Sequence, residues 1–159
     1  MLPRFGVNIS TEEEYRQVEW YGMRYHENFD ERKTWSRVSK YTSSVANLFV
    51  PNIRTQENGN RTDIRSLKFT LASEKGIEIF VPERFGFSAH HQLNDDFDPD
   101  GKEQKRHTFA IKKRTLVNLN IDYRQMGVGG DNRWGNLPME KYQIKPENLS
   151  YSYVILPIW

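Results

Sequence analysis

The sequence contains no cysteine. This absence excludes disulfide bonds, metal sites with thiolate ligands and a cysteine nucleophile. No apolar run approaches the roughly 20 residues that span a bilayer, and the first residues, MLPRFGV, lack the apolar core of a secretion signal. The residues therefore predict neither a transmembrane helix nor a leader, and they leave the compartment open.

An excess of charge of one sign is also missing. The 23 Lys and Arg residues nearly balance the 21 Asp and Glu residues, and both signs are scattered along the chain. Because phosphate recognition needs a concentrated basic surface, a nucleic acid is not an expected partner. The 159 residues show no break in composition and suffice for one core, so we predict a single domain over residues 1–159.

Apolar residues alternate with other residues in five segments, which is the pattern of half-buried β-strands. The alternating positions are Phe5, Val7 and Ile9; Leu67, Phe69 and Leu71; Ile77, Ile79 and Val81; Val117, Leu119, Ile121 and Tyr123; and Tyr151, Tyr153 and Ile155. Turn-forming residues separate these segments at spacings typical of all-β sandwiches. Only residues 30–46 could hold much helix. The sequence predicts an all-β fold of antiparallel strands with little helix.

Motifs of common enzymes are absent or incomplete. The glycines at 127–135 do not form a nucleotide fingerprint, because the third glycine of G-x-G-x-x-G would fall at Asn132. No serine lies in G-x-S-x-G, and no H-E-x-x-H occurs. Glycoside hydrolysis by retention needs two carboxylates about 5 Å apart, and spacing alone pairs none of the candidates. These candidates are Glu27, Glu57, Asp63, Asp122 and Asp131.

A calcium loop is matched only in its first half. Asp96, Asp98, Asp100 and Gly101 fit the opening D-x-D-x-D-G, in which alternating oxygens surround the ion. His107 stands where the loop needs a bidentate glutamate, so a plain acidic turn is favoured over a calcium site.

His90 and His91 are adjacent, and neighbouring side chains of a strand point to opposite faces. They therefore cannot chelate one metal together, and we expect one to point inward and the other into solvent. With these motifs set aside, we predict no metal and no cofactor on this chain.

The segment GVGGDNRWG, residues 127–135, surrounds Trp134 with four glycines and three polar residues. Glycine tolerates positive φ, so the segment is predicted to be a loop. Three consecutive polar residues before Trp134 are hard to satisfy in a core, which favours a displayed indole over a core anchor. A rigid indole can cover the apolar C–H face of a pyranose, so sugar stacking or a partner contact is the sharper hypothesis.

Six blocks of the sequence, in this order and spacing, resemble the C-terminal module of glycoside hydrolase family 2 β-galactosidases. They are LPRFGV (2–7), VEWYG (18–22) followed by Glu-Asn at 27–28, QENGNRTDIR (56–65), FSA (87–89), LNIDYRQMGVGGDNRWG (119–135) and a final tyrosine-rich strand. The resemblance runs nearly the whole chain. It implies a galactose-mutarotase-like β-supersandwich, the last domain of an enzyme whose catalytic glutamates lie in a separate (β/α)₈ barrel. The resemblance therefore implies no catalytic residue on this chain.

The resemblance also implies a role for Trp134. In that family the tryptophan of the glycine-rich loop reaches the active site of the barrel and forms an aromatic platform for the sugar on the leaving-group side. A galactoside substrate, the remaining domains of the enzyme as partners and a homo-oligomer follow from the same resemblance. The loop after WYG departs from the family, since Arg24 and Tyr25 replace a Gly-Pro, Phe29 replaces a tyrosine and Glu31 precedes Arg32.

Two other functions stay open. A free-standing carbohydrate-binding module would use the same indole without a barrel. An aldose epimerase would need an acid and a base, such as His90, His91 or His107 with a glutamate, but no epimerase motif surrounds these histidines. The family's module is longer than 159 residues, so we expect uncovered strands and, with them, self-association or marginal solubility.

Overall fold

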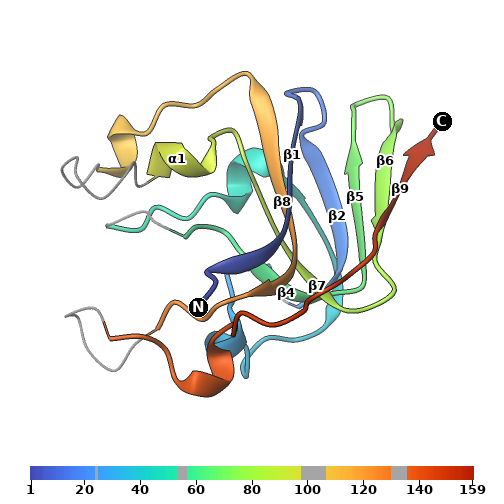
Figure 1. Ribbon diagram of the computed structural model, residues 1–159. Coiled ribbons are helices and arrows are strands. Elements are labelled where there is room, and N and C mark those ends of the chain that lie inside the picture. Colours follow the sequence, from blue (N-terminus) through green and yellow to red (C-terminus); the bar gives the residue numbers. More distant parts are fainter. Residues whose placement is uncertain (24, 54–56, 98–106, 130–135) are drawn as a thin grey trace.

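The structure is a computed structural model that describes residues 1–23, 25–53, 57–97, 107–129 and 136–159. Nine strands in this described part form two antiparallel sheets that pack face to face (Figure 1). The strands are β1 (Arg4–Glu12), β2 (Gln17–Gly22), β3 (Ser39–Ser44), β4 (Arg61–Ile64), β5 (Ser66–Thr70), β6 (Gly76–Phe80), β7 (Phe85–His90), β8 (Leu116–Gln125) and β9 (Val154–Ile158). One sheet has the order β1-β8-β7-β4 and the other β3-β2-β5-β6-β9. The prediction of an all-β sandwich is confirmed.

In the part of the chain that the structure describes, helical structure is limited to short turns. They are α1 (Asn94–Phe97) and the 3₁₀ turns η1 (Asp30–Arg32), η2 (Val45–Leu48), η3 (Thr108–Ala110) and η4 (Glu140–Tyr142). Residues 30–46, the stretch that could have held most helix, contain only the turn η1 and the start of η2, with β3 between them. Tyr41 of β3 lies opposite Trp20 of β2, with ring centroids 5.4 Å apart, so pairing with the core tryptophan stabilises the strand here.

The core lies between the two sheets. Its central aromatic contacts join Trp20 of β2 and Phe69 of β5 to Phe87 of β7, with ring centroids 5.7 Å and 6.4 Å from that of Phe87. The other buried members are Val18, Val45, Leu48, Ile64, Leu67, Ile79, Val81, Phe85, Ala89, Val117, Leu119 and Ile121. Full burial of one such side chain contributes about 1.5 to 3 kcal/mol, so this layer drives the folding of the sandwich.

Four of the five predicted strands match β1, β5, β6 and β8. The fifth is displaced, because β9 begins at Val154 and leaves Tyr151 and Tyr153 before it. The ring of Tyr151 instead packs against Phe5 and Tyr123, at centroid distances of 5.6 and 5.8 Å. The alternating tyrosines before β9 therefore reflect packing between rings, not the pairing of a strand.

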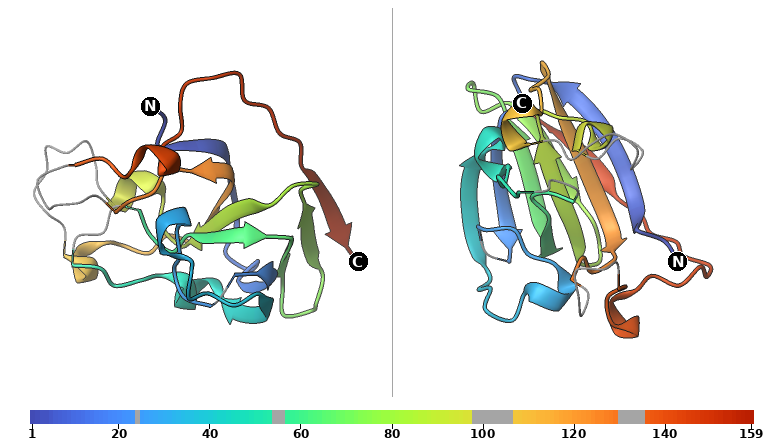
Figure 2. Two further views of the ribbon diagram at one scale, coloured as in Figure 1. Left: turned by 90° about the horizontal axis from the view of Figure 1, so that it is seen from below. Right: turned by 90° about the vertical axis from the view of Figure 1, so that its left-hand side faces the viewer.

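Three of the short helical turns lie on one side of the sandwich. Figures 1 and 2 show α1, η3 and η4 on the side away from β9, with the N-terminus near η4 and the C-terminus at the opposite margin. Of these segments, α1 is bonded to the outer face of the four-stranded sheet, since Asn94 contacts Asn118 and Asn120 of β8. Within the described ranges, no helix is long and apolar enough to cross a membrane.

Candidate functional site

The outer face of the four-stranded sheet carries short polar side chains that are buried. Along β8, Asn118, Asn120 and Asp122 alternate with apolar residues of the core, so they point to this outer face. On β7, Ser88 and His90 pair in register with Asn120 and Asn118. All five residues are buried. A buried polar group is costly unless it is hydrogen-bonded, so the segments that cover this face and bond to it define the site.

Four asparagines and a serine form a network over the centre of this face. Asn8 Nδ2, from β1, donates to Asn118 Oδ1 at 2.9 Å and to Asn120 Oδ1 at 2.8 Å. Asn94, the first residue of α1, donates to Asn120 Oδ1 at 3.1 Å and accepts from Asn118 Nδ2 at 3.2 Å. Asn120 Nδ2 donates to Ser88 Oγ at 2.9 Å. The network fixes α1 against the sheet.

A charged network continues the polar face toward the end of β8. The Arg4 guanidinium donates to Asp122 Oδ2 at 3.2 Å and to Glu57 Oε2 at 2.5 Å. Gln125 Nε2 donates to the same Glu57 oxygen at 2.8 Å. Burial raises the pKa of Asp122 to about 6, against the opposing effect of Arg4 and with a smaller contribution from Glu57. Arg4 therefore holds two carboxylates that lie more than 60 residues apart in the sequence.

His90 lies at the other end of the face, beneath the loop that contains Asn58 and Gly59. Its Nε2 lies 2.8 Å from the Asn58 carbonyl oxygen, and its ring contacts Phe97 of α1 at a centroid distance of 5.2 Å. Burial lowers the pKa of His90 to about 4, so the imidazole is neutral at pH 7 and its Nε2 donates to the carbonyl. Gly59 has a φ of 66°, and a Cβ there would lie 2.6 Å from the His90 ring. Glycine is therefore required at this close approach.

The covering segments leave a hollow of about 880 Å³ over the polar face. Its floor includes Ser88, His90 and Asn120, and one wall includes Arg4 and Glu57. Its remaining lining residues are Pro3, Glu27, Arg32, Asn52, Ile53, Asn58, Asn94, Phe97, Met126, Gly127, Val128, Asn136, Leu137 and Pro138. Buried amides and charges beside exposed apolar groups such as Val128 and Leu137 make the hollow suited to a polar ligand with apolar faces.

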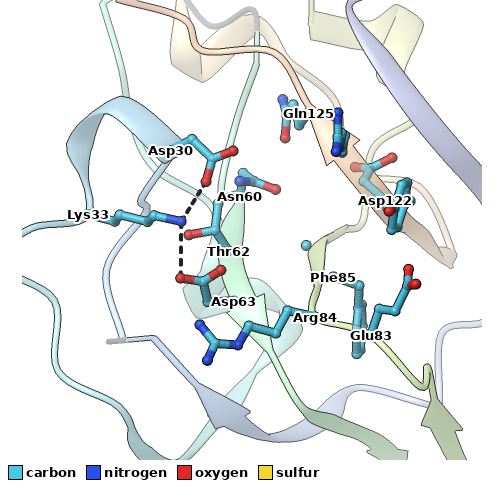
Figure 3. Close-up of a pocket in the computed structure, with 13 residues that line it drawn as sticks. Asp30, Lys33, Asn60, Thr62, Asp63, Glu83, Arg84, Phe85, Asp122 and Gln125 are labelled. Carbon is cyan, nitrogen blue, oxygen red and sulfur yellow. Dashed lines mark hydrogen bonds and ion pairs between the residues drawn. The ribbon is translucent and has the colours of Figure 1, made fainter. Parts of the chain in front are cut away.

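A smaller hollow of about 310 Å³ adjoins the end of β8 (Figure 3). On one side Lys33 donates to Asp30 at 2.7 Å and forms an ion pair with Asp63 at 3.0 Å. Burial alone would lower the pKa of Lys33, but its hydrogen bonds to both carboxylates raise it above its ordinary value. Figure 3 shows Asp122 and Gln125 across the hollow from this triad.

Trp134 and Asp131 lie outside the described residues. The residues that precede and follow them in the described part, 126–128 and 136–138, belong to the lining of the larger hollow. Residues 126–128 follow directly on the end of β8, where the glycine-rich segment begins.

Comparison with known proteins supplies the family. A family model described as "Beta galactosidase small chain" matches residues 1–155. The chain belongs to this family. The resemblance found in the sequence blocks is thereby confirmed.

Three relatives of this chain are each named Beta-galactosidase. The chain is 30% identical over 146 residues to such a protein of Halalkalibacterium halodurans, which covers 92% of this chain and 14% of the relative. It is 29% identical over 133 residues to one of Priestia megaterium, covering 84% and 12%. It is 26% identical over 155 residues to one of Pseudoalteromonas haloplanktis, covering 97% and 14%. The chain thus spans only about one seventh of the length of these relatives.

The candidate carboxylates of this small-chain domain fall into separate groups. Arg4 brings Glu57 and Asp122 together, whereas Glu27 accepts the backbone N–H of Gly59 at 2.7 Å. Asp63 is paired with Lys33 in the smaller hollow. The candidates near the larger hollow are therefore engaged in bonds that shape the loops around it.

The possible calcium loop begins at Asp96. Both oxygens of Asp96 are bonded by Arg114 at 2.7 Å, while Asp98, Asp100 and Gly101 lie outside the described residues. Among the residues that the structure describes, no group of three or more His, Asp or Glu side chains is placed to hold a metal ion. The calcium loop stays a hypothesis that the described residues do not test.

The expectation of one solvated histidine in the pair 90–91 is wrong, because both are buried. His91 Nδ1 lies 2.8 Å from the carbonyl oxygen of Leu116, whereas His90 bonds to that of Asn58. They bond to different segments, as expected of neighbours that point to opposite faces. His107 lies elsewhere, stacked on Phe109 with ring centroids 5.4 Å apart.

Two residues of the site were not found from the sequence. Arg4 lies inside a recognised block, but its acidic partners are 53 and 118 residues away. Glu31 was noted only as a departure from the family pattern, yet its carboxylate bonds to backbone 97 and 98 residues further on. No local spacing signal exists for contacts of this range.

Proposed function

We propose that this chain is a non-catalytic domain of a β-galactosidase, and that Trp134 forms an aromatic platform for the sugar on the leaving-group side of the substrate site. Membership of the small-chain family supports the first part, as do relatives named Beta-galactosidase of which the chain spans 12 to 14%. The remaining domains of such an enzyme would be its partners and would carry the catalytic glutamates.

One observation carries the platform role. The described residues on both sides of Trp134, among them Val128 and Leu137, line the hollow of about 880 Å³. This volume falls in the range of about 300 to 1,000 Å³ that is usual for ligand sites. Amides of the sheet can serve sugar hydroxyls, and an indole near the rim would cover the C–H face of a pyranose.

The bonding of the carboxylates supports a non-catalytic role for this chain. Glu57 and Asp122, the two carboxylates that Arg4 brings together, share its guanidinium. Retaining hydrolysis requires one carboxyl to deliver a proton and a second to attack the sugar, with both facing the glycosidic bond. Glu57 and Asp122 instead pair with Arg4 of β1, and Asp122 belongs to β8. These carboxylates therefore stabilise the structure of the site and do not cleave the bond.

Replacement of Trp134 by alanine in the complete enzyme tests the platform. We expect binding of glucose as acceptor to weaken by about 1 to 3 kcal/mol, while turnover of small activated galactosides changes much less. Trp159→Ala removes a tryptophan that is 91% exposed and is the matched control. If Trp134→Ala instead cost about 3 to 5 kcal/mol of stability and left acceptor binding unchanged, the indole would be a core anchor.

The 159-residue chain by itself provides a second test. We expect it not to hydrolyse a chromogenic β-galactoside, and to bind galactosides weakly or not at all in a calorimetric titration. Hydrolysis that survives removal of host enzyme would contradict the non-catalytic role. Strong binding by the chain alone would favour a free-standing carbohydrate-binding module.

A further inference from the structure

Glu31 reaches across the molecule to the backbone of the glycine-rich segment. It belongs to η1, and its side chain is only 10% exposed. Its Oε1 accepts the N–H of Val128 at 2.9 Å and the N–H of Gly129 at 3.0 Å. Two successive backbone N–H groups that converge on one carboxylate oxygen form a charge-assisted anchor. This anchor holds the last described residues before Trp134, which follows five positions after Gly129.

The glycines of the segment make room for this carboxylate. A Cβ built on Gly127 would lie 2.7 Å from Glu31 Oε2 and 3.1 Å from its Cδ. A Cβ on Gly129 would touch Oε1 at 3.4 Å, which is ordinary van der Waals contact. Gly127 is therefore the position at which a side chain would displace Glu31. Gly127 is held from the other side as well, since its N–H donates to the Tyr142 carbonyl at 3.0 Å.

The segment that carries Glu31 is itself firmly attached. Asn28 is buried, and its Oδ1 accepts the backbone N–H of Thr62 at 2.9 Å and the Thr62 hydroxyl at 2.7 Å. Phe29 is buried beneath the guanidinium of Arg32, which lies 4.9 Å from the ring centroid. Residues 28–32 are thus tied to β4 and to the core, so Glu31 extends from a fixed support.

Arg32 links Glu31 to a second anchor of the same kind. Its guanidinium lies 3.7 Å from Glu31 Oε1 and 3.6 Å from Glu27 Oε1. Glu27 uses its other oxygen to accept the N–H of Gly59 at 2.7 Å. One short segment therefore braces two glycine-containing loops, and both loops border the larger hollow.

We propose that Glu31 is a positioning residue, whose carboxylate fixes the backbone at 128–129 and thereby sets where Trp134 is presented to the sugar. The proposal deepens the platform role of Trp134 and rests on it. A purely structural Glu31 would stabilise the whole sandwich, whereas a positioning Glu31 acts on the loop and on acceptor binding. The two roles can be told apart by where the effect of a substitution appears.

Amide hydrogen exchange in the 159-residue chain tests the anchor. We expect Glu31→Ala to raise exchange at Val128 and Gly129 at least tenfold, with β8 amides such as Leu119 unchanged. Glu31→Gln keeps an acceptor oxygen without the charge and should give a smaller increase. Glu140→Ala removes an exposed carboxylate of the nearby η4 turn and is the matched control. Unchanged protection at 128–129, or equal loss of protection along β8, would overturn the proposal.

A double-substitution cycle in the complete enzyme tests the link to Trp134. We expect Glu31→Ala to raise the KM for glucose as acceptor several-fold toward the value of Trp134→Ala, with little change in kcat on a small activated galactoside. The double variant should be no worse than Trp134→Ala alone. Additive losses would overturn the link between Glu31 and the indole. If Trp134→Ala alone leaves acceptor binding unchanged, the platform role fails, and the exchange result still decides whether Glu31 anchors the loop.

Discussion

The outer faces of the two sheets differ although the same alternation of apolar and polar residues builds both. On the five-stranded sheet the outward side chains include Glu19, Lys40, Lys68 and Glu78, which face solvent and form ion pairs across strands. At the centre of the four-stranded sheet, on β7 and β8, the outward side chains include two asparagines, a serine, a histidine and an aspartate that are buried. The outer face of the five-stranded sheet is therefore solvated, whereas polar segments of the chain, such as α1, cover the outer face of the four-stranded sheet.

The type of polar residue explains the difference. Long charged side chains lose much free energy when they leave water, so they suit a solvated face. Asparagine and serine are short and can both donate and accept, so the buried Asn118 and Asn120 find hydrogen-bond partners in the exposed Asn8 and in the buried Ser88. The covered face therefore supports loops from distant parts of the chain, and the hollow forms among those loops.

The largest expected effect comes from removing the Arg4 guanidinium, which pairs with two carboxylates on the outer face of the four-stranded sheet. This face, covered by loops, is the covered face. Arg4→Met removes the partner of Asp122, a carboxylate that is 1% exposed, and leaves a buried charge unpaired. We expect a loss of about 3 to 5 kcal/mol in the free energy of unfolding at pH 7.5, measured with urea. Lys68→Met on the solvated face removes the pair with Glu78 and should change it by no more than about 1 kcal/mol. Equal losses in the two variants would show that the two faces are energetically alike.

A second prediction concerns how the free energy of unfolding depends on pH through two buried groups of the covered face, Asp122 and His90. The folded pKa of Asp122 is about 6, above its ordinary 3.8, so its contribution to stability is present below pH 4 and is lost as the pH rises through 6. The folded pKa of His90 is about 4, below its ordinary 6.5, so its contribution is present above pH 6.5 and is lost as the pH falls through 4. Each shift of about two pKa units corresponds to about 3 kcal/mol. The two contributions nearly cancel in the parent chain.

Single substitutions should reveal each slope. Between pH 7 and pH 4 we expect Asp122→Asn to lose about 3 kcal/mol relative to the parent, because it no longer gains from protonation of Asp122 in the folded state. Over the same range His90→Asn should gain a similar amount relative to the parent. Urea unfolding at pH 4, 5, 6 and 7 measures both. Changes of the same sign in the two variants would refute the assignment of opposite slopes.

The strands could be predicted where one face of each meets the core. Alternation located β1, β5, β6 and β8, because their apolar positions all point into the sandwich. It did not single out β2, β4 or β7. It also missed β3, where Tyr41 is one of few apolar residues and pairs with Trp20. It was displaced at β9, because Tyr151 packs on Phe5 rather than in a sheet. In both places, contacts between residues far apart in the sequence determine the local structure.

The candidate site could be predicted only as a set of sequence blocks. Family resemblance pointed to the glycine-rich segment and to Trp134, but it could not give the partners of Asp122 or of the segment's backbone. Arg4 and Asp122 are 118 residues apart, and Glu31 and Val128 are 97 residues apart. Such contacts depend on how the two sheets stack, which a one-dimensional pattern does not encode.

The smallest expected effect on stability concerns the edge of the five-stranded sheet. Among the described residues β9 pairs only with β6, and it exposes Val154, Ile155 and Leu156. Figure 2 shows it at the margin of the sandwich, away from the loops of the site. An apolar edge strand with unpaired backbone groups favours pairing between chains, so we expect the 159-residue chain to self-associate at micromolar concentration. Leu156→Lys should shift sedimentation toward the monomer with little change in the free energy of unfolding. Leu137→Lys changes an equally exposed leucine at the rim of the hollow and is the matched control, so dispersal by Leu137→Lys alone would place the contact between chains at the site rather than at β9.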